Sequence, residues 1–201
     1  MARWKPNAQE RLQEAAMELF QQRGYEHTTV ADIAAKAGLT ERTFFRYFSD
    51  KREVLFSGAK ALEKLIVDAI ASAPVALPPF EVVFAALKTT APLFESRRAH
   101  ARQRQALLSQ HAELRERELG KLANIAVRIS ESLQARHVSA ANATLIAEAA
   151  VAIYRSAFER WVADTKHDLP HHLQAALAQL RKLTASAKTA TPATKAARTR
   201  H

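Results

Sequence analysis

The stretch GLTERTFFRYF, Gly38 to Phe48, carries four aromatic residues among its last five positions, and the fifth is an arginine. On a helix drawn at 100° per residue, Phe44 and Phe48 lie one turn apart on the same edge. Both rings can therefore pack into a core, while Arg42 and Arg46 point away from it. The spacing predicts a short helix that buries one edge and presents the other to a charged partner.

The residues before this stretch predict two more helices. Apolar residues recur with helical spacing over 12–20 and again, more briefly, over 30–37. Each predicted helix follows a capping pair or a capping hydroxyl, namely Asn7 with Glu10, Thr29 with Asp32, and Thr40. Two short helices joined by AGLT predict a helix-turn-helix, in which Thr40 to Phe48 is the recognition helix.

The outward edge of this recognition helix suits a DNA groove. Arginine bonds guanine bidentately, hydroxyl groups hold phosphate oxygens, and an apolar ring meets a thymine methyl group. Here Thr43 and Tyr47 place two hydroxyls on one flank, and Phe45 stands on the other. Glu41 has two interpretations, because it can accept from a cytosine amino group or simply favour the positive start of the helix.

The rest of the chain is also expected to be helical, which makes the predicted fold class all-α. The sequence has four glycines, so little turn chemistry for strands is present. Asp50 with Glu53 is expected to cap a long fourth helix. After a proline-rich break at 76–80, a helical pattern runs to about 136. It resumes after 139 through 161 and restarts at 170 to reach 183. We expect a helix-turn-helix domain over 1–57, a helical bundle over 58–184, and a disordered basic tail over 185–201.

Composition excludes several classes of function. The formal net charge is +10, but residues 181–201 hold six basic and no acidic residues, so net charge does not locate a DNA site. The chain has no cysteine, no apolar leader and no run of about 18 apolar residues, and we expect a cytoplasmic protein without a membrane span. It also lacks a nucleophile motif and a glycine-rich phosphate loop, so we expect no catalytic residues, no enzyme activity and no cofactor.

We also expect no metal site. His171 and His172 are adjacent, so on a helix they diverge, and the sequence has no H-E-x-x-H or comparable pair.

The N-terminal residues resemble the TetR family of transcriptional regulators over about 11–56. The resemblance rests on an ordered set: Gly24-Tyr25, Thr28-Thr29-Val30, Ile33-Ala34, Ala37-Gly38-Leu39-Thr40, Thr43, Phe44-Phe45, Tyr47-Phe48, Lys51 and Leu55. It implies a helical DNA-binding domain, a larger helical domain that binds a ligand and forms a homodimer, and a repressor that a small molecule releases from a palindromic operator. The last two predicted helices, about 142–164 and 171–183, are the expected dimer surface.

Matched position by position, the resemblance implies two sets of DNA contacts. Base contacts fall on Thr40, Glu41, Arg42, Phe45 and Arg46, and phosphate contacts fall on Thr29, Thr43, Tyr47 and Lys51. Lys51 is expected in the first turn of the fourth helix, where its charge opposes the helix dipole and an external phosphate explains its placement. Two positions depart from the family: position 42 is commonly small but is arginine here, and position 45 is commonly tyrosine but is phenylalanine here. The operator sequence can therefore not be inferred from the resemblance.

The C-terminal half resembles the family in helix count and, more loosely, the subgroup that binds acyl-CoA-like ligands. We expect a hydrophobic or acyl-CoA-like effector in a pocket lined by Phe84, Leu87, Phe94, Leu107, His111, Tyr154, Phe158 and Trp161. The arginines at 97, 98, 102 and 104 are either a solvated helix face or contacts to an anionic ligand. Two alternatives stay open for the whole chain: a helical ligand carrier, and a nonspecific DNA-binding protein that uses its basic tail.

Overall fold

The computed structural model describes residues 7–95 and 97–185, and within these ranges it contains helices and turns but no strands. The all-α fold class is thus confirmed; all but the first residue of the predicted tail, 185–201, lies outside the described residues. The elements are α1 (Ala8–Arg23), α2 (Val30–Lys36), α3 (Glu41–Tyr47), the 3₁₀ helix η1 (Glu53–Phe56), α4 (Ala59–Ser72), α5 (Pro79–Lys88), α6 (Pro92–Glu95), α7 (Arg98–Gln110), α8 (Ala112–Ala135), α9 (Ala140–Ala163) and α10 (Leu169–Ala185).

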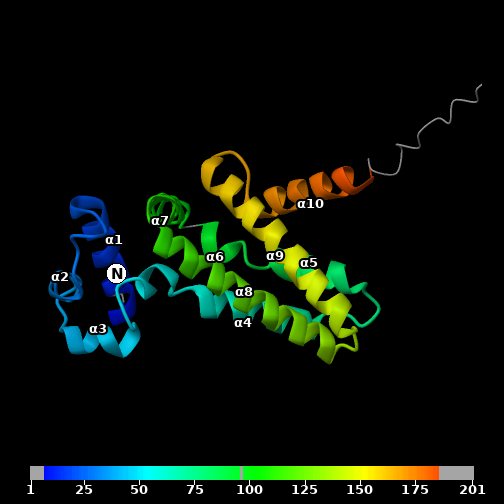
Figure 1. The fold of residues 1–201 in the computed structure, drawn as a ribbon, viewed down its shortest axis with the longest axis horizontal. Helices are drawn as coiled ribbons and strands as arrows, with labels where there is room; N and C mark the ends of the chain where they lie inside the picture. Colours follow the sequence, from blue (N-terminus) through cyan, green and yellow to red (C-terminus); the bar gives the residue numbers. More distant parts are fainter. Residues whose placement is uncertain (1–6, 96, 186–201) are drawn as a thin grey trace, which may run out of the picture.

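Helices α1 to α3 form a compact unit at one end of the molecule (Figure 1). The predicted caps are present: the Asn7 side chain accepts from the Glu10 amide at 2.9 Å, and the Thr29 hydroxyl accepts from the Asp32 amide at 3.1 Å. Gly38 ends the turn after α2 with φ at +64°, and a Cβ there would lie 3.0 Å from the Arg11 guanidinium. The turn therefore requires glycine.

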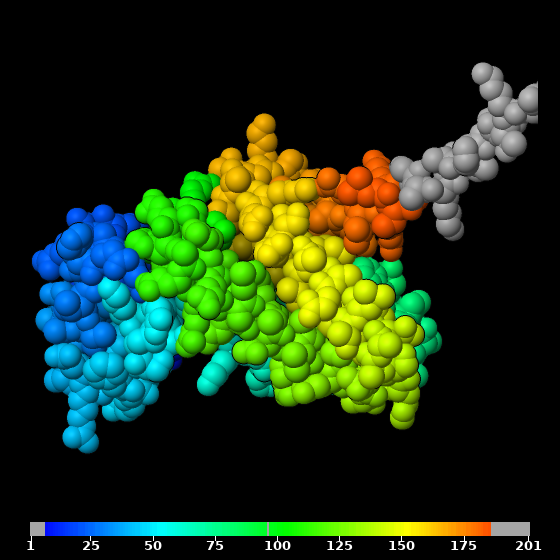
Figure 2. Space-filling model, in the orientation of Figure 1, coloured from blue at the N-terminus to red at the C-terminus, as the bar shows by residue number. Residues whose placement is uncertain are grey.

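The core of this N-terminal unit is completed by residues from much later in the chain. Phe44, Phe48 and the apolar faces of α1 and α2 are buried together with Leu108 of α7 and Leu114 of α8. Each fully buried leucine contributes roughly 1.5–3 kcal/mol to the burial of apolar surface. The space-filling view shows the first three helices abutting the segment that contains α7 and the start of α8 (Figure 2).

The predicted start of the fourth helix is wrong. Asp50 Oδ1 accepts from the amides of Arg52 and Glu53 at 2.8 and 3.2 Å, but the helical segment that follows is the single turn η1, whose N-cap residue is Arg52. The long helix α4 begins only at Ala59. The physical reason is burial of all of 54–56, because three consecutive residues cannot share the single apolar stripe of an amphipathic helix.

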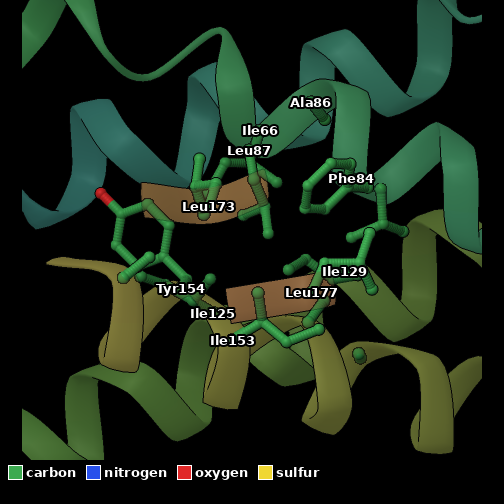
Figure 3. Close-up of a cluster of buried hydrophobic side chains, with 14 of the residues drawn as sticks. Ile66, Phe84, Ala86, Leu87, Ile125, Ile129, Ile153, Tyr154, Leu173 and Leu177 are labelled. Atoms are coloured by element: carbon green, nitrogen blue, oxygen red, sulfur yellow. The ribbon is translucent and has the colours of Figure 1, made fainter. Parts of the chain in front are cut away.

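The C-terminal part is a bundle in which α8 packs along α9, and α9 packs along α10. Figure 3 shows its interior, where apolar side chains from α4, α5, α8, α9 and α10 converge: Ile66, Phe84, Leu87, Ile129, Ile153, Leu173 and Leu177. The helical pattern that ends near 136 is interrupted at His111, a break that the sequence pattern did not predict. Across the described part of the chain, no helix is both long and apolar enough to cross a membrane.

Candidate nucleic-acid interface and internal cavity

The short helix α3 divides its aromatic residues between the core and the surface. Phe44 is fully buried and Phe48 nearly so, while 55% of Phe45 and 40% of Tyr47 are exposed. The ring of Phe44 packs edge-on against Phe45, with centroids 5.6 Å apart, and lies 5.4 Å from Phe48. The predicted division between inward and outward edges is confirmed, so α3 is anchored by two rings and exposes the side that carries arginine.

The exposed side of α3 carries polar groups in reach of a partner. Arg42 and Glu41 are exposed, and the hydroxyls of Thr40 and Thr43 lie 3.1 Å apart. Arg46 is also exposed, and its Nη2 donates to the Tyr47 hydroxyl at 3.2 Å. This edge presents hydrogen-bond donors and one apolar ring without a covering element in the described chain.

Thr29 lies at the start of α2 and is engaged in a capping box. Its hydroxyl donates to Asp32 Oδ2 at 2.6 Å, and its amide donates to the same oxygen at 3.0 Å. These hydrogen bonds hold the pKa of Asp32 below its usual value, with a smaller contribution from Arg23. A phosphate contact from Thr29 would therefore share the hydroxyl with the cap.

Lys51 is placed differently from the expectation. It precedes η1 rather than lying in a long helix, so the argument from an opposing helix dipole does not apply. Its ammonium group donates to the carbonyls of Tyr25 at 2.8 Å, Thr28 at 3.1 Å and Glu26 at 3.4 Å, and lies 4.3 Å from the centre of the Tyr25 ring. Lys51 therefore stabilises the turn between α1 and α2 through contacts with three of its carbonyls.

A cavity of about 260 Å³ lies where η1 and α4 meet α7, α8 and α9. Much of its wall is apolar, formed by residues that include Leu62, Leu93, Phe94, Leu122, Ile125 and Phe158. Charged or titratable groups line the remainder, and the basic ones outnumber the acidic ones: Arg97, His100, Arg104, Lys121 and Arg155, against Glu118 and Glu159. The cavity combines an apolar wall with an excess of positive charge.

The structure brings three of the eight predicted pocket residues to this cavity, namely Phe94, Tyr154 and Phe158. Phe84, Leu87 and Trp161 are buried in the C-terminal core without lining it. Leu107 packs against the N-terminal core, and His111 lies at the junction of α7 and α8, with its ring 4.9 Å from Tyr25.

Of the four arginines considered as contacts to an anionic ligand, Arg97 and Arg104 line the cavity, whereas Arg98 and Arg102 donate to backbone carbonyls. Sequence reasoning missed the lining residues Leu55 and Phe56. The sequence shows an apolar run at 54–56, but it does not show that this run packs near α7, because that contact depends on tertiary packing.

Two side chains at the cavity, the buried Tyr154 and the half-buried His100, have shifted pKa values. Burial raises the pKa of Tyr154 far above its usual value, against smaller opposing effects of Thr90 and Arg104. Thr90 donates its own proton to the carbonyl of Leu87, and the Tyr154 hydroxyl makes no hydrogen bond of normal geometry in the described chain. Burial, together with Arg97 and Arg104, lowers the pKa of His100. Tyr154 is thus a lining residue of the cavity whose hydroxyl is buried.

Arg104 joins the cavity to the N-terminal unit. Its Nε donates to the carbonyl of Leu55 at 2.8 Å, its Nη1 donates to Glu118 at 2.9 Å, and its guanidinium lies 4.9 Å from the Phe56 ring centre. A second link runs from Glu53 of η1 to Arg117 at 2.6 Å and to Lys121 at 2.9 Å on α8. The single turn η1 is thus held by α7 and α8, two of the helices that border the cavity.

Comparison with known proteins gives two family matches. Residues 12–57 match the bacterial regulatory proteins of the tetR family, and residues 77–185 match the MftR C-terminal domain. The HTH-type transcriptional regulator TcmR of Streptomyces glaucescens is 37% identical over 73 residues, which cover 36% of this chain. The match spans only 32% of the length of TcmR.

Solved structures share the fold over nearly the whole chain. Thermus thermophilus FadR in complex with lauroyl-CoA has a TM-score of 0.54 and 23% identity, over 95% of this chain and 100% of that one. A regulator from Syntrophomonas wolfei has a TM-score of 0.58 and 18% identity, covering 92% and 98%. The SmeT–triclosan complex has a TM-score of 0.57 and 18% identity, covering 87% and 91%. At these identities, the likeness concerns the fold.

Proposed function

The chain belongs to the TetR family of bacterial regulatory proteins, and from this premise we propose that it is a repressor that binds a palindromic operator as a homodimer. Members of this family are transcriptional regulators rather than enzymes. The observation that carries the proposal is the arrangement of α3, in which two buried rings hold an exposed edge rich in donors. A small molecule in the C-terminal cavity would release the operator.

The proposed base contacts are Thr40, Glu41, Arg42, Phe45 and Arg46, and the proposed phosphate contacts are Thr29, Thr43, Tyr47 and Lys51. The exposure of Arg42, Phe45 and Arg46 supports the first set, because base edges are read by side chains that reach into the groove. For Lys51, a phosphate contact would have to coexist with three carbonyl contacts, so a change of that residue is expected to affect stability as well as affinity.

Two features support a homodimer: the short length of the recognition helix α3 and the exposed leucines on α9 and α10. Helix α3 has seven residues and can read few base pairs, whereas two copies would read half-sites about 34–36 Å apart or a multiple of that distance. Leu145 of α9 is 70% exposed, and Leu183 of α10 is 67% exposed. Leucines this exposed on neighbouring helices support a surface that a second copy covers.

The cavity supports an effector with an apolar chain and an anionic group. Leu122, Ile125 and Phe158 offer apolar contacts, and the basic side chains that line the cavity offset negative charge. The fold relatives include FadR, which binds lauroyl-CoA, and SmeT, which binds triclosan. We propose the acyl-CoA class, with the acyl chain in the cavity.

Release would operate through Arg104. An anionic ligand group beside Arg104 would compete with the Leu55 carbonyl and with Glu118 for the guanidinium. Breaking the bond from Arg104 to Leu55 would free η1 to shift relative to α7, and the separation of the two α3 helices in a dimer would change. The ligand must bind the shifted state more tightly than the DNA-binding state, since only such a difference moves the equilibrium.

Fluorescence anisotropy tests the proposal. The protein is titrated against DNA from upstream of its own gene and against a scrambled sequence at one salt concentration, because affinities at different salt are not comparable. We expect tighter binding to the upstream DNA, and release on addition of lauroyl-CoA. Equal affinity for both DNAs would contradict operator recognition.

Two variants separate the steps. Arg104→Met should weaken specific DNA binding even without ligand and lose most of the response to lauroyl-CoA, since it lacks the hydrogen bond to the Leu55 carbonyl that the ligand would break. A chain shortened after residue 185 tests the nonspecific alternative: if this truncation abolishes binding while Arg46→Ala has no effect, binding resides in the basic tail.

A further inference from the structure

Three side chains with metal-binding atoms meet at the turn between α9 and α10. Asp164 ends α9, His167 lies in the turn, and His172 is in the first turns of α10. Asp164 Oδ2 lies 2.7 Å from His167 Nδ1 and 3.1 Å from His172 Nε2. All three ligand atoms lie within 4.8 Å of one another, which places two imidazoles and a carboxylate around one point.

This cluster is not the pair that the sequence analysis considered. The rings of His171 and His172 lie in edge contact, with centroids 5.5 Å apart and planes at 84°, and His171 also stacks on His167 with centroids 4.1 Å apart. His172 reaches the end of α9, where its Nε2 lies 3.1 Å from Asp164 Oδ2. The spacing D-x-x-H-x-x-x-x-H becomes visible as a cluster only once the turn brings the two helix ends together.

The turn that carries these ligands is fixed by contacts that do not use the ligand atoms. Arg98 of α7 donates to the carbonyl of Asp164 at 2.8 Å and to the carbonyl of His167 at 2.7 Å. The Lys166 amide donates to Asp164 Oδ1 at 2.8 Å, and Asp168 accepts from the amide of His171 at 2.9 Å. Asp164 Oδ2 and the imidazoles are thus held near their positions by a braced backbone.

We propose that Asp164, His167 and His172 form a binding site for a divalent transition-metal ion of the zinc class. Zinc takes imidazole nitrogen and carboxylate oxygen at about 2.0–2.2 Å in tetrahedral geometry, which sets neighbouring ligand atoms roughly 3.3–3.6 Å apart. The two separations from Asp164 Oδ2, 2.7 and 3.1 Å, lie below that spacing and the third is at most 4.8 Å, so the side chains must shift to admit the ion. His172 is buried, whereas His167 is about half exposed, which leaves the fourth position open to solvent.

The nearby charges set the strength of the site. The Arg98 guanidinium opposes a cation, but it is turned to backbone carbonyls rather than to the ligand atoms. The Asp164 carboxylate supplies the compensating negative charge. A bound ion would join the end of α9 to the start of α10, and we expect it to stabilise the helix pair proposed above as the dimer surface. The metal site itself does not depend on the proposed function.

Metal titration of the full chain, without an affinity tag and after treatment with a chelator, tests the site. Zn²⁺ is added in competition with a chromogenic chelator, and we expect one saturable equivalent per chain and a rise in Tm. Co²⁺ in place of Zn²⁺ should give the visible absorption bands of a tetrahedral site. His172→Ala and His167→Gln should each weaken binding by more than the roughly 10- to 100-fold typical of losing an outer-shell partner.

His171→Ala is the matched control, because it removes an adjacent imidazole that stacks on His167 without belonging to the cluster. It should keep the full stoichiometry. Since His172 is buried, its variant is checked by circular dichroism, and the exposed His167→Gln gives an independent reading if His172→Ala does not fold. Absence of saturable binding, or binding that survives His167→Gln unchanged, would overturn the proposal and leave the cluster as a hydrogen-bonded end of α9.

Discussion

Arg46 and Lys51 are five residues apart, yet the structure gives their cations opposite surroundings. The Arg46 guanidinium is exposed beside the Tyr47 hydroxyl, whereas the Lys51 ammonium is enclosed by three backbone carbonyls. Helical spacing predicted the outward direction of Arg46. The environment of Lys51 could not be predicted in this way, because its carbonyl partners lie 23 to 26 residues earlier and meet it only through the packing of α1 against α2.

Arg46→Ala is expected to weaken operator binding by about 1–3 kcal/mol and to relax specificity at the base it contacts. The reason is that alanine cannot make the bidentate hydrogen bonds of this exposed side chain, which does not support the core. Anisotropy against the operator and against single-base variants of it measures both effects. An equal loss of affinity for all of those DNAs would instead assign Arg46 to phosphate.

Lys51→Ala is expected to act on both binding and folding. If the Lys51 ammonium binds a phosphate, its removal should weaken binding to all DNA sequences alike and lower the slope of log affinity against log salt by about one. Removal of this charged donor to the carbonyls of Tyr25 and Thr28 should also lower the free energy of unfolding, by about 1–3 kcal/mol.

Urea unfolding and salt-dependent anisotropy separate these contributions. Lys64→Ala, which removes an exposed lysine of α4, serves as the charge control, since surface ion pairs contribute little to stability. If Lys51→Ala changed stability and left the salt slope intact, Lys51 would be a structural residue only.

At the scale of elements, the predicted capping residues located the starts of α1, α2 and α3, and tertiary packing decided the exceptions. Asn7, Thr29 and Thr40 cap these helices at the expected places. The exceptions are η1 and the break at His111. In both places, residues at or beside the irregular segment are buried in the N-terminal core. Local pattern cannot reveal such positions, because the partners that bury them are far away in the sequence.

The link between η1 and α8 predicts a dependence of stability on pH. Burial alone would raise the pKa of Glu53, but hydrogen bonds from Lys121 and Arg117 outweigh burial and hold it below its usual value. A carboxyl group with a lowered pKa stabilises the folded state above its unfolded pKa of about 4.3, and this stabilisation is lost as the pH falls. Glu53→Gln should therefore be less stable at pH 7 and lose less stability between about pH 5 and more acidic values.

Urea unfolding at a series of pH values measures this slope. Glu14→Gln, which changes an exposed carboxyl group on α1, controls for the loss of one acidic residue. Identical slopes for Glu53→Gln and the unchanged protein would mean that the contacts of Glu53 with α8 carry no net stabilisation.

At the scale of the whole molecule, the proposed dimer surface on α9 and α10 would determine whether two recognition helices bind DNA together. Leu145→Glu combined with Leu183→Glu is expected to shift the protein toward the monomer and to weaken operator binding at least tenfold, because each copy then reads one half-site alone. Sedimentation analysis measures the mass.

Val75→Glu is the matched control. Val75 is 94% exposed in the turn between α4 and α5 and belongs to neither α9 nor α10. A Leu145/Leu183 variant that remained dimeric would place the dimer surface elsewhere.

The dependence of the N-terminal core on Leu108 and Leu114 has a consequence for protein engineering. Regulators of this family invite the construction of biosensors in which a DNA-reading head is spliced onto a foreign sensing body. A DNA-binding unit cut after residue 57 would lack Leu108 and Leu114, which complete its core. The new ligand-binding domain would have to supply apolar side chains of matching shape at the same places. The transferable unit of this protein is therefore the head together with a graft of the α7–α8 junction.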